Sequence, residues 1–170
     1  MKQLICCLLI LSLALCLFAC TEKEPELKAP VRFYYPRSQT VQGKDDGVIS
    51  WELRESVGHE TDYAYLLGLY LQGPDSDTLS HIFRGGITLE NLTIGDTYAV
   101  VVLSDSFAQL SGLSLTLACA CLTATVSDLT GVQTVTVRTQ TLPLDGSPFI
   151  SMDRSKLLLW DNTAVPEEQN

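Results

Sequence analysis

Basic and histidine side chains are scarce in this chain. Its 170 residues include eleven lysines and arginines and two histidines, against twenty aspartates and glutamates, for a formal net charge of −9. The shortage of basic residues argues against nucleic-acid binding, which needs a basic surface, and against electrostatic attraction to anionic lipids. The shortage of histidine leaves few candidates for acid–base catalysis.

Cysteine is also scarce beyond the N-terminal segment. After Cys20 the chain contains only Cys119 and Cys121, which fall within an apolar helical pattern. On a helix, residues two apart point about 200° away from each other, so this pair cannot easily form a disulfide. Because no further cysteine or nearby histidine completes a metal site, we interpret both as buried, unreactive thiols.

The N-terminus carries an apolar run with the features of a secretory signal. Lys2 precedes residues 4–19, which are almost entirely apolar, and the charged segment 21–25 follows. A charged start, an apolar centre and a small residue before the cleavage point are typical of a signal peptide. Cys20 at that point resembles the bacterial lipobox, in which the cysteine is lipidated and becomes the mature N-terminus. An uncleaved anchor and ordinary secretion are the alternatives, and all three readings place the rest of the chain outside the cytoplasm.

These features divide the chain into four parts. Residues 1–19 are the predicted lipoprotein signal peptide, 20–30 a lipidated tether, 31–160 the folded domain and 161–170 a polar tail. Removing the signal leaves 170 − 19 = 151 residues, enough for one domain with a hydrophobic core. We expect the acyl chains on Cys20, such as palmitate, to hold the protein at the extracytoplasmic face of the cell membrane.

Alternating apolar and polar residues predict strands, and apolar residues at helical spacing predict two helices. The expected strands are 31–35, 48–54, 88–94, 97–103 and 134–140, with a short last strand at 156–160, and the expected helices are 63–72 and 113–129. The alternation in 48–54 and 134–140 leaves one sheet face polar, so both helices should cover the other face. The sequence therefore predicts an α+β fold, a two-layer sandwich with two helices on one face of a mixed sheet, in the order β-β-α-β-β-α-β.

Details of the two predicted helices carry further expectations. Gly68 lies in the middle of the first helix, where it costs roughly 1 kcal/mol relative to alanine. A close backbone approach at that point would explain it. The second helix carries one apolar stripe, formed by Leu113, Leu117, Ala120, Cys121 and Ala124.

Six short motifs occur in a fixed order between residues 63 and 146. They are LLGLYLQGP at 66–74, Ile82 with Gly85-Gly86, AVVVLS at 99–104 with Phe107, residues 118–125 with Thr123 and Thr125, residues 131–135, and the Asp145-Gly146 turn. Together they resemble the GerMN domain, also called the sporulation and spore germination domain. Phe83 and Leu103 depart from the residues that are usual in that family.

The resemblance implies a fold and a class of function. GerMN domains are commonly found in lipoproteins of spore-forming and related Gram-positive bacteria, and they are similar to ring-building modules of the channel between mother cell and forespore. The resemblance thus implies a lipid-anchored binding or assembly module of the envelope, linked to sporulation or germination. Its partners would be envelope proteins reached by protein–protein interaction, with a homo-oligomer as a further option.

The remaining candidates for catalysis have simpler interpretations. His59 and Asp62 precede a predicted helix, where acidic residues stabilise the helix dipole. His81 follows Asp77 by four residues, the spacing of an ordinary surface pair on a helix. Ser104–Ser106 combines serine with a carboxylate, but neither histidine lies in a nucleophile-elbow context. We therefore expect no enzyme activity, no metal site and no cofactor.

The polar sheet face is the candidate contact surface. Its proposed contact residues are Glu52, Thr136 and Arg138. We expect substitutions at these positions to remove contacts with envelope proteins.

A lipoprotein that binds a small ligand or a cell-wall fragment is the alternative function. A deep apolar pocket lined by Trp51, Tyr63 or Tyr70 would favour it.

Overall fold

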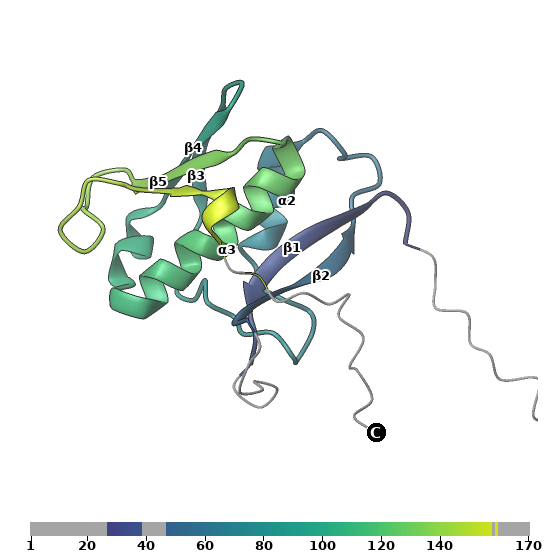
Figure 1. Cartoon of the computed structure of the whole chain (residues 1–170), viewed down its shortest axis with the longest axis horizontal. Coiled ribbons are helices and arrows are strands. Elements are labelled where there is room, and N and C mark those ends of the chain that lie inside the picture. Colours follow the sequence, from purple (N-terminus) through teal and green to yellow (C-terminus); the bar gives the residue numbers. More distant parts are fainter. Residues whose placement is uncertain (1–26, 39–46, 158, 160–170) are drawn as a thin grey trace, which may run out of the picture.

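Strands and helices follow one another in the predicted order. The computed structural model describes residues 27–38, 47–157 and 159 (Figure 1). The described elements are β1 (Pro30–Pro36), β2 (Ile49–Glu55), α2 (Tyr63–Tyr70), β3 (Leu89–Ile94), β4 (Tyr98–Leu103), the 3-10 helix η2 (Asp105–Gln109), α3 (Gly112–Thr130), β5 (Thr134–Thr139), β6 (Ile150–Asp153) and the 3-10 helix η3 (Arg154–Lys156). The α+β fold class is confirmed. The predicted signal peptide, Cys20 and the polar tail lie outside the described residues.

The larger sheet is mixed, with the strand order β3-β4-β5-β6. β3 and β4 form an antiparallel hairpin, β4 and β5 run parallel, and β5 and β6 are antiparallel. A parallel pair needs a long crossover, which η2 and α3 provide between β4 and β5. The segment that is apolar on both faces, β4, lies inside this sheet, as its sequence predicts.

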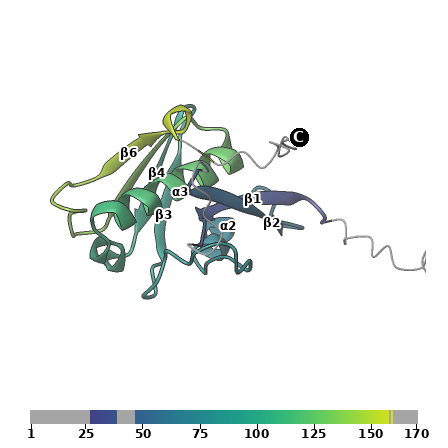
Figure 2. The ribbon, with the colours of Figure 1, turned by 60° about the horizontal axis from the view of Figure 1, so that its bottom comes forward.

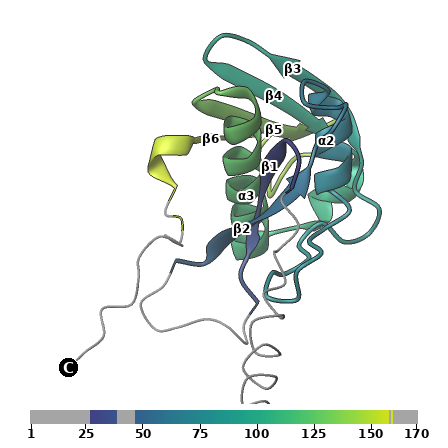
Figure 3. The same cartoon turned by 90° about the vertical axis from the view of Figure 1, so that its right-hand side faces the viewer.

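β1 and β2 form a second, two-stranded sheet, which the sequence pattern did not predict. Figures 2 and 3 show α3 between this hairpin and the four-stranded sheet. One side of α3 packs with Val101 and Val135 in the main core, and the other side packs Ala120 and Cys121 against Tyr34. By length and composition α3 could cross a membrane, but 61% of its apolar window is buried inside the domain. It is therefore the core helix of this fold.

At Tyr34 the edge of β1 is closed by helix side chains instead of another strand. The Tyr34 N–H donates to Thr125 Oγ1 of α3 at 3.0 Å, and the Tyr70 hydroxyl of α2 donates to the Tyr34 carbonyl oxygen at 3.0 Å. Tyr70 is fully buried, and its ring stacks on Tyr35 and meets Phe33 edge-on. This aromatic cluster joins α2 to the hairpin. Each aromatic pair stabilises the contact beyond the burial of its surface area.

The position of the last strand differs from the prediction. The last strand is β6, and the predicted strand at 156–160 is wrong, because Arg154–Lys156 forms η3. Asp145 and Gly146, both at positive φ, reverse the chain so that Ile150 pairs with Val137. A four-residue strand is too short to give a periodic signal of its own.

Alanine substitutions at Gly68 and Gly73 are expected to have opposite effects on stability. A Cβ at Gly68 meets nothing within 4 Å, so the expected close approach is wrong. Gly73 has φ +100°, and a Cβ there would lie 2.7 Å from the His81 ring. We predict that Gly73→Ala lowers the free energy of unfolding by about 1–3 kcal/mol. Gly68→Ala should raise it by about 0.5–1 kcal/mol, as measured by urea denaturation. If both substitutions changed the free energy of unfolding by the same amount, the prediction would be contradicted.

Cys119 and Cys121 are free and buried, as predicted. They lie in different clusters, Cys119 against the main core and Cys121 against the β1–β2 hairpin. Burial raises the pKa of Cys119 to about 12 and also raises the pKa of Cys121. Because the thiolate is the reactive form, neither thiol should react with iodoacetamide at pH 8 until the protein is unfolded.

The same pKa shift fixes the sign of a pH effect on stability. Folding raises the pKa of the Cys119 thiol. Its contribution to the free energy of unfolding is therefore complete at pH values below the pKa of the unfolded state, and it is lost as the pH rises through the pKa of the folded state. We predict that the free energy of unfolding falls between about pH 9 and pH 12, and falls less steeply in Cys119→Ala. An identical alkaline slope in the variant would contradict it.

Candidate functional site

The three predicted contact residues do not share one surface. Glu52 lies on β2 of the two-stranded sheet, whereas Thr136 and Arg138 lie on β5 of the four-stranded sheet. The expectation of a single polar face was based on one continuous sheet. Since the strands are divided between two sheets, that face is not continuous, and the three residues need separate accounts.

Glu52 holds a loop in place. Its carboxylate accepts from Arg54 Nε at 2.8 Å and from the backbone N–H groups of Asp75 and Ser76 at 3.1 and 3.0 Å. Arg54 in turn donates to the Gly73 carbonyl oxygen at 3.0 Å. The side chain of Glu52 is only 11% exposed. It therefore fastens the segment after α2 to β2, and little of it is left for a partner.

Thr136 and Arg138 lie on the face of the larger sheet that α3 does not cover. Their neighbours Val135 and Val137 point into the core, so alternation places Thr136 and Arg138 on the opposite face. Thr136 Oγ1 lies 3.0 Å from Ser151 Oγ of β6, and Arg138 is exposed. These two remain candidates for contact with a partner.

The residues weighed for catalysis are separated and used in local contacts. The His59 ring stacks on Tyr65 at 3.8 Å, and Asp105 accepts hydrogen bonds from Thr141. His81 lies against Gly73. Within the described ranges, no group of three His, Cys, Asp or Glu side chains could hold a metal ion.

The aromatic residues expected around a ligand pocket are engaged in the fold. Tyr70 is fully buried, and Trp51 has the Arg32 guanidinium 5.0 Å above its ring. Tyr63 is partly buried at the start of α2 and packs against the core. None of the three residues lines the cavities that the described residues form beside α3, β1 and β5.

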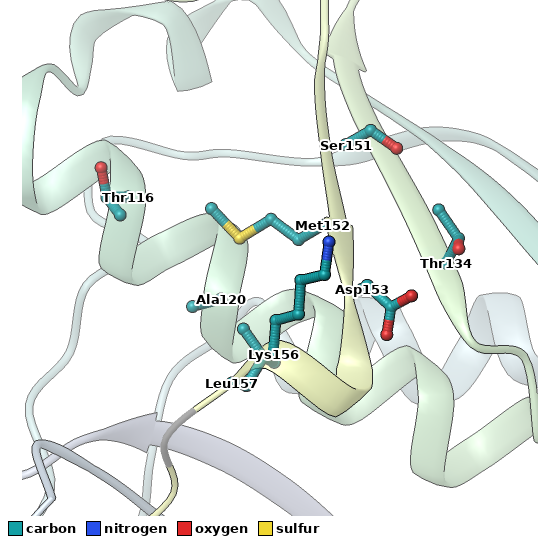
Figure 4. A pocket seen from close by; sticks show the side chains of 8 residues that line it. All are labelled: Thr116, Ala120, Thr134, Ser151, Met152, Asp153, Lys156 and Leu157. Atoms are coloured by element: carbon teal, nitrogen blue, oxygen red, sulfur yellow. The ribbon is translucent and has the colours of Figure 1, made fainter.

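An open groove lies between α3, β6 and η3 (Figure 4). Its volume is about 420 Å³, and its lining residues are Thr116, Ala120, Thr134, Ser151, Met152, Asp153, Lys156 and Leu157. Figure 4 shows Met152 reaching towards α3, whereas Ser151 and Asp153 point to the other side of β6. Hydrogen bonds from Ser155 lower the pKa of Asp153. Asp153 is thus an ionised cap of η3, and the floor of the groove is apolar.

The groove continues the apolar stripe of α3. The stripe is buried at Ala120, Cys121 and Ala124, but Leu113 is 73% exposed and Leu117 is partly exposed. The predicted stripe is buried only in its second half, against the hairpin. The prediction missed the other side of α3, where Leu115, Ala118, Cys119, Leu122 and Val126 pack in the main core. The first half is left open beside the groove.

Comparisons with known proteins give one distant structural similarity. No family model and no curated protein matches the chain. A crystal structure of a "Putative Lipoprotein from Clostridium perfringens" is similar over 74% of this chain and 87% of that chain, with a TM-score of 0.45 and 16% sequence identity. At this level the similarity carries no argument about function. The lipoprotein and GerMN interpretations remain predictions from the sequence.

Proposed function

We propose that this protein is a lipid-anchored binding module at the outer face of the cytoplasmic membrane. It would contact an envelope protein through the groove between α3 and β6. The observation that carries the proposal is the open half of the α3 stripe, where Leu113 is 73% exposed beside an apolar groove of about 420 Å³. An exposed apolar surface with a polar rim is typical of a protein contact site.

The sequence supports attachment through lipid. Without the signal peptide the chain has ten basic and twenty acidic side chains, a balance of 10 − 20 = −10, which offers no attraction to anionic lipid. Acyl chains on Cys20 would supply the attachment, and stable anchoring takes more than one chain.

Leu113, at the open end of the α3 stripe, would lie away from the membrane. β1, which follows the tether, begins next to the end of α3, since Arg32 lies 3.8 Å from Asp128. Leu113 is fifteen residues earlier in α3, about 22 Å along the helix at 1.5 Å per residue. Figure 1 accordingly shows the start of β1 and the start of α3 at opposite ends of the domain. A partner in the envelope could reach Leu113 without displacing the anchor.

The motif resemblance to GerMN supports a link to sporulation or germination. We propose binding instead of catalysis, because the two histidines lie in separate loop segments and are engaged in local contacts. A second copy of the chain is one candidate partner.

A photo-crosslinking amino acid placed at Leu113 in intact cells tests the proposed contact. The matched control is Val57, which is 54% exposed in the loop after β2. We expect position 113 to form a discrete crosslinked product and position 57 to form none, and the mass of the product separates a homodimer from a heterologous partner. Adding Met152→Glu should remove the product. Equal crosslinking at both positions, or none at 113, would contradict the proposal.

A further inference from the structure

A second cavity lies at the edge of β1 and shares no lining residue with the groove. Its volume is about 450 Å³, within the range of small-ligand sites. Its lining residues are Pro30, Val31, Arg32, Leu53, Glu60, Asp128 and Leu129. They come from β1, β2, the loop after β2 and the last turn of α3. The cavity therefore combines apolar walls with charges of both signs.

The backbone of β1 has unused hydrogen-bonding groups at this cavity. Alternate residues of an edge strand turn their N–H and C=O groups outward. At Tyr34 both groups are paired, with Thr125 and Tyr70, and the Pro36 carbonyl oxygen accepts from the Ser80 N–H at 2.7 Å. Arg32 turns its groups to the same side, and no residue of the described chain pairs with them.

The Arg32 side chain is held in place but makes no hydrogen bond to any described residue. Its guanidinium lies over the Trp51 ring and 3.8 Å from Asp128, beyond hydrogen-bonding distance, and it is 54% exposed. Asp128 already accepts from the Tyr34 hydroxyl at 2.8 Å and from Arg154 at 3.5 Å. Two cations thus share one carboxylate, and Arg32 keeps five donors that match a carboxylate.

The opposite charge is available in the same cavity. Glu60 accepts from the Gly58 N–H at 3.1 Å, and backbone hydrogen bonds lower the pKa of its carboxyl, so it is ionised at neutral pH. Leu129 belongs to the last turn of α3, which ends at Thr130. The C-terminal end of a helix carries partial negative charge and attracts cations. An ammonium group would be stabilised on this side.

We propose that this cavity binds a short peptide with free ends, of about dipeptide size. Its carboxylate would bind the Arg32 guanidinium, its ammonium group would lie towards Glu60 and the end of α3, and its peptide group would pair with the Arg32 backbone. Small apolar side chains would contact Val31, Leu53 and Leu129. This site goes beyond the proposed function, because it uses neither the groove nor the lipid anchor.

Calorimetric titration of the full-length protein in detergent tests the site with alanyl-alanine as the probe. The L,L and D,D forms are both titrated, because D-residues would indicate cell-wall peptides and L-residues protein fragments. We expect at least one of the two forms to bind. N-acetylation and C-amidation of the dipeptide should each weaken its binding roughly tenfold or more. No binding at millimolar concentrations, or equal binding of the blocked peptides, would overturn the proposal.

Two variants assign the ends of the ligand. Arg32→Gln should weaken binding of the free dipeptide roughly tenfold, and this variant should bind the free dipeptide and its C-amide equally well. Glu60→Gln should also weaken binding of the free dipeptide roughly tenfold, and this variant should bind the free dipeptide and its N-acetyl form equally well. Arg84→Gln, an exposed arginine in another loop, should change neither. If Arg32→Gln binds like the wild type, the assignment is wrong. The blocked peptides on wild-type protein decide the question even if a variant fails to fold.

Discussion

Glu52→Gln is expected to destabilise the domain by about 3 kcal/mol and to lower its melting temperature by about 10 °C. The side chains of Glu52 and Arg54 are 11% and 14% exposed, so the pair is largely shielded from water. Glutamine would leave the Arg54 charge with only the Asp75 carboxylate, 3.0 Å away on a side chain that is 79% exposed, and would accept less strongly from the Asp75 and Ser76 N–H groups. Removing one member of a buried pair costs more than the pair contributes, because the other charge stays desolvated.

Glu55→Gln is the matched control. Glu55 lies on the same strand, carries the same charge and is exposed. Its replacement should change the free energy of unfolding by no more than about 0.5 kcal/mol. If Glu52→Gln were as stable as Glu55→Gln but lost a crosslinked partner, Glu52 would be a contact residue as the sequence predicts. Thermal unfolding followed by circular dichroism distinguishes these results.

Cys20→Ala is expected to release nearly all of the protein from the membrane. The change removes the sulfur that carries the lipid, and the acidic domain has no electrostatic attraction to anionic lipid that could replace it. Cell fractionation with immunoblotting should find the variant in the medium or the soluble fraction. Cys16→Ala, inside the predicted signal peptide, is the control and should stay with the membrane. Retention of Cys20→Ala would contradict lipidation at this position.

The sequence predicts the larger sheet well and the smaller one poorly. The alternation of Val135 and Val137 with polar residues places β5 correctly, and the start and end of α3 agree within one residue. Alternation in β2 is equally compatible with any sheet, so it cannot say which strands pair. The burial of Phe33, Tyr34 and Tyr35 in succession shows that β1 is covered on both faces. Only the tertiary structure reveals that two helices provide the cover.

The candidate sites were harder to predict than the fold. Polarity placed Glu52 on a polar face, but a polar face can hold a loop as well as a partner, and the backbone N–H groups that it binds lie more than 20 residues away. The groove requires that the hairpin cover only half of the α3 stripe, which no local pattern encodes. In the sequence Arg32 is a single charged residue in a predicted strand. That its guanidinium has unused donors becomes clear only from its position over Trp51 and 3.8 Å from Asp128.

Mass spectrometry of the mature N-terminus tests the central claim, that this domain works from a lipid anchor. Protein extracted from membranes should yield an N-terminal peptide that begins at Cys20 and carries the added mass of two or three acyl chains. An unmodified N-terminus at any other residue would contradict the account.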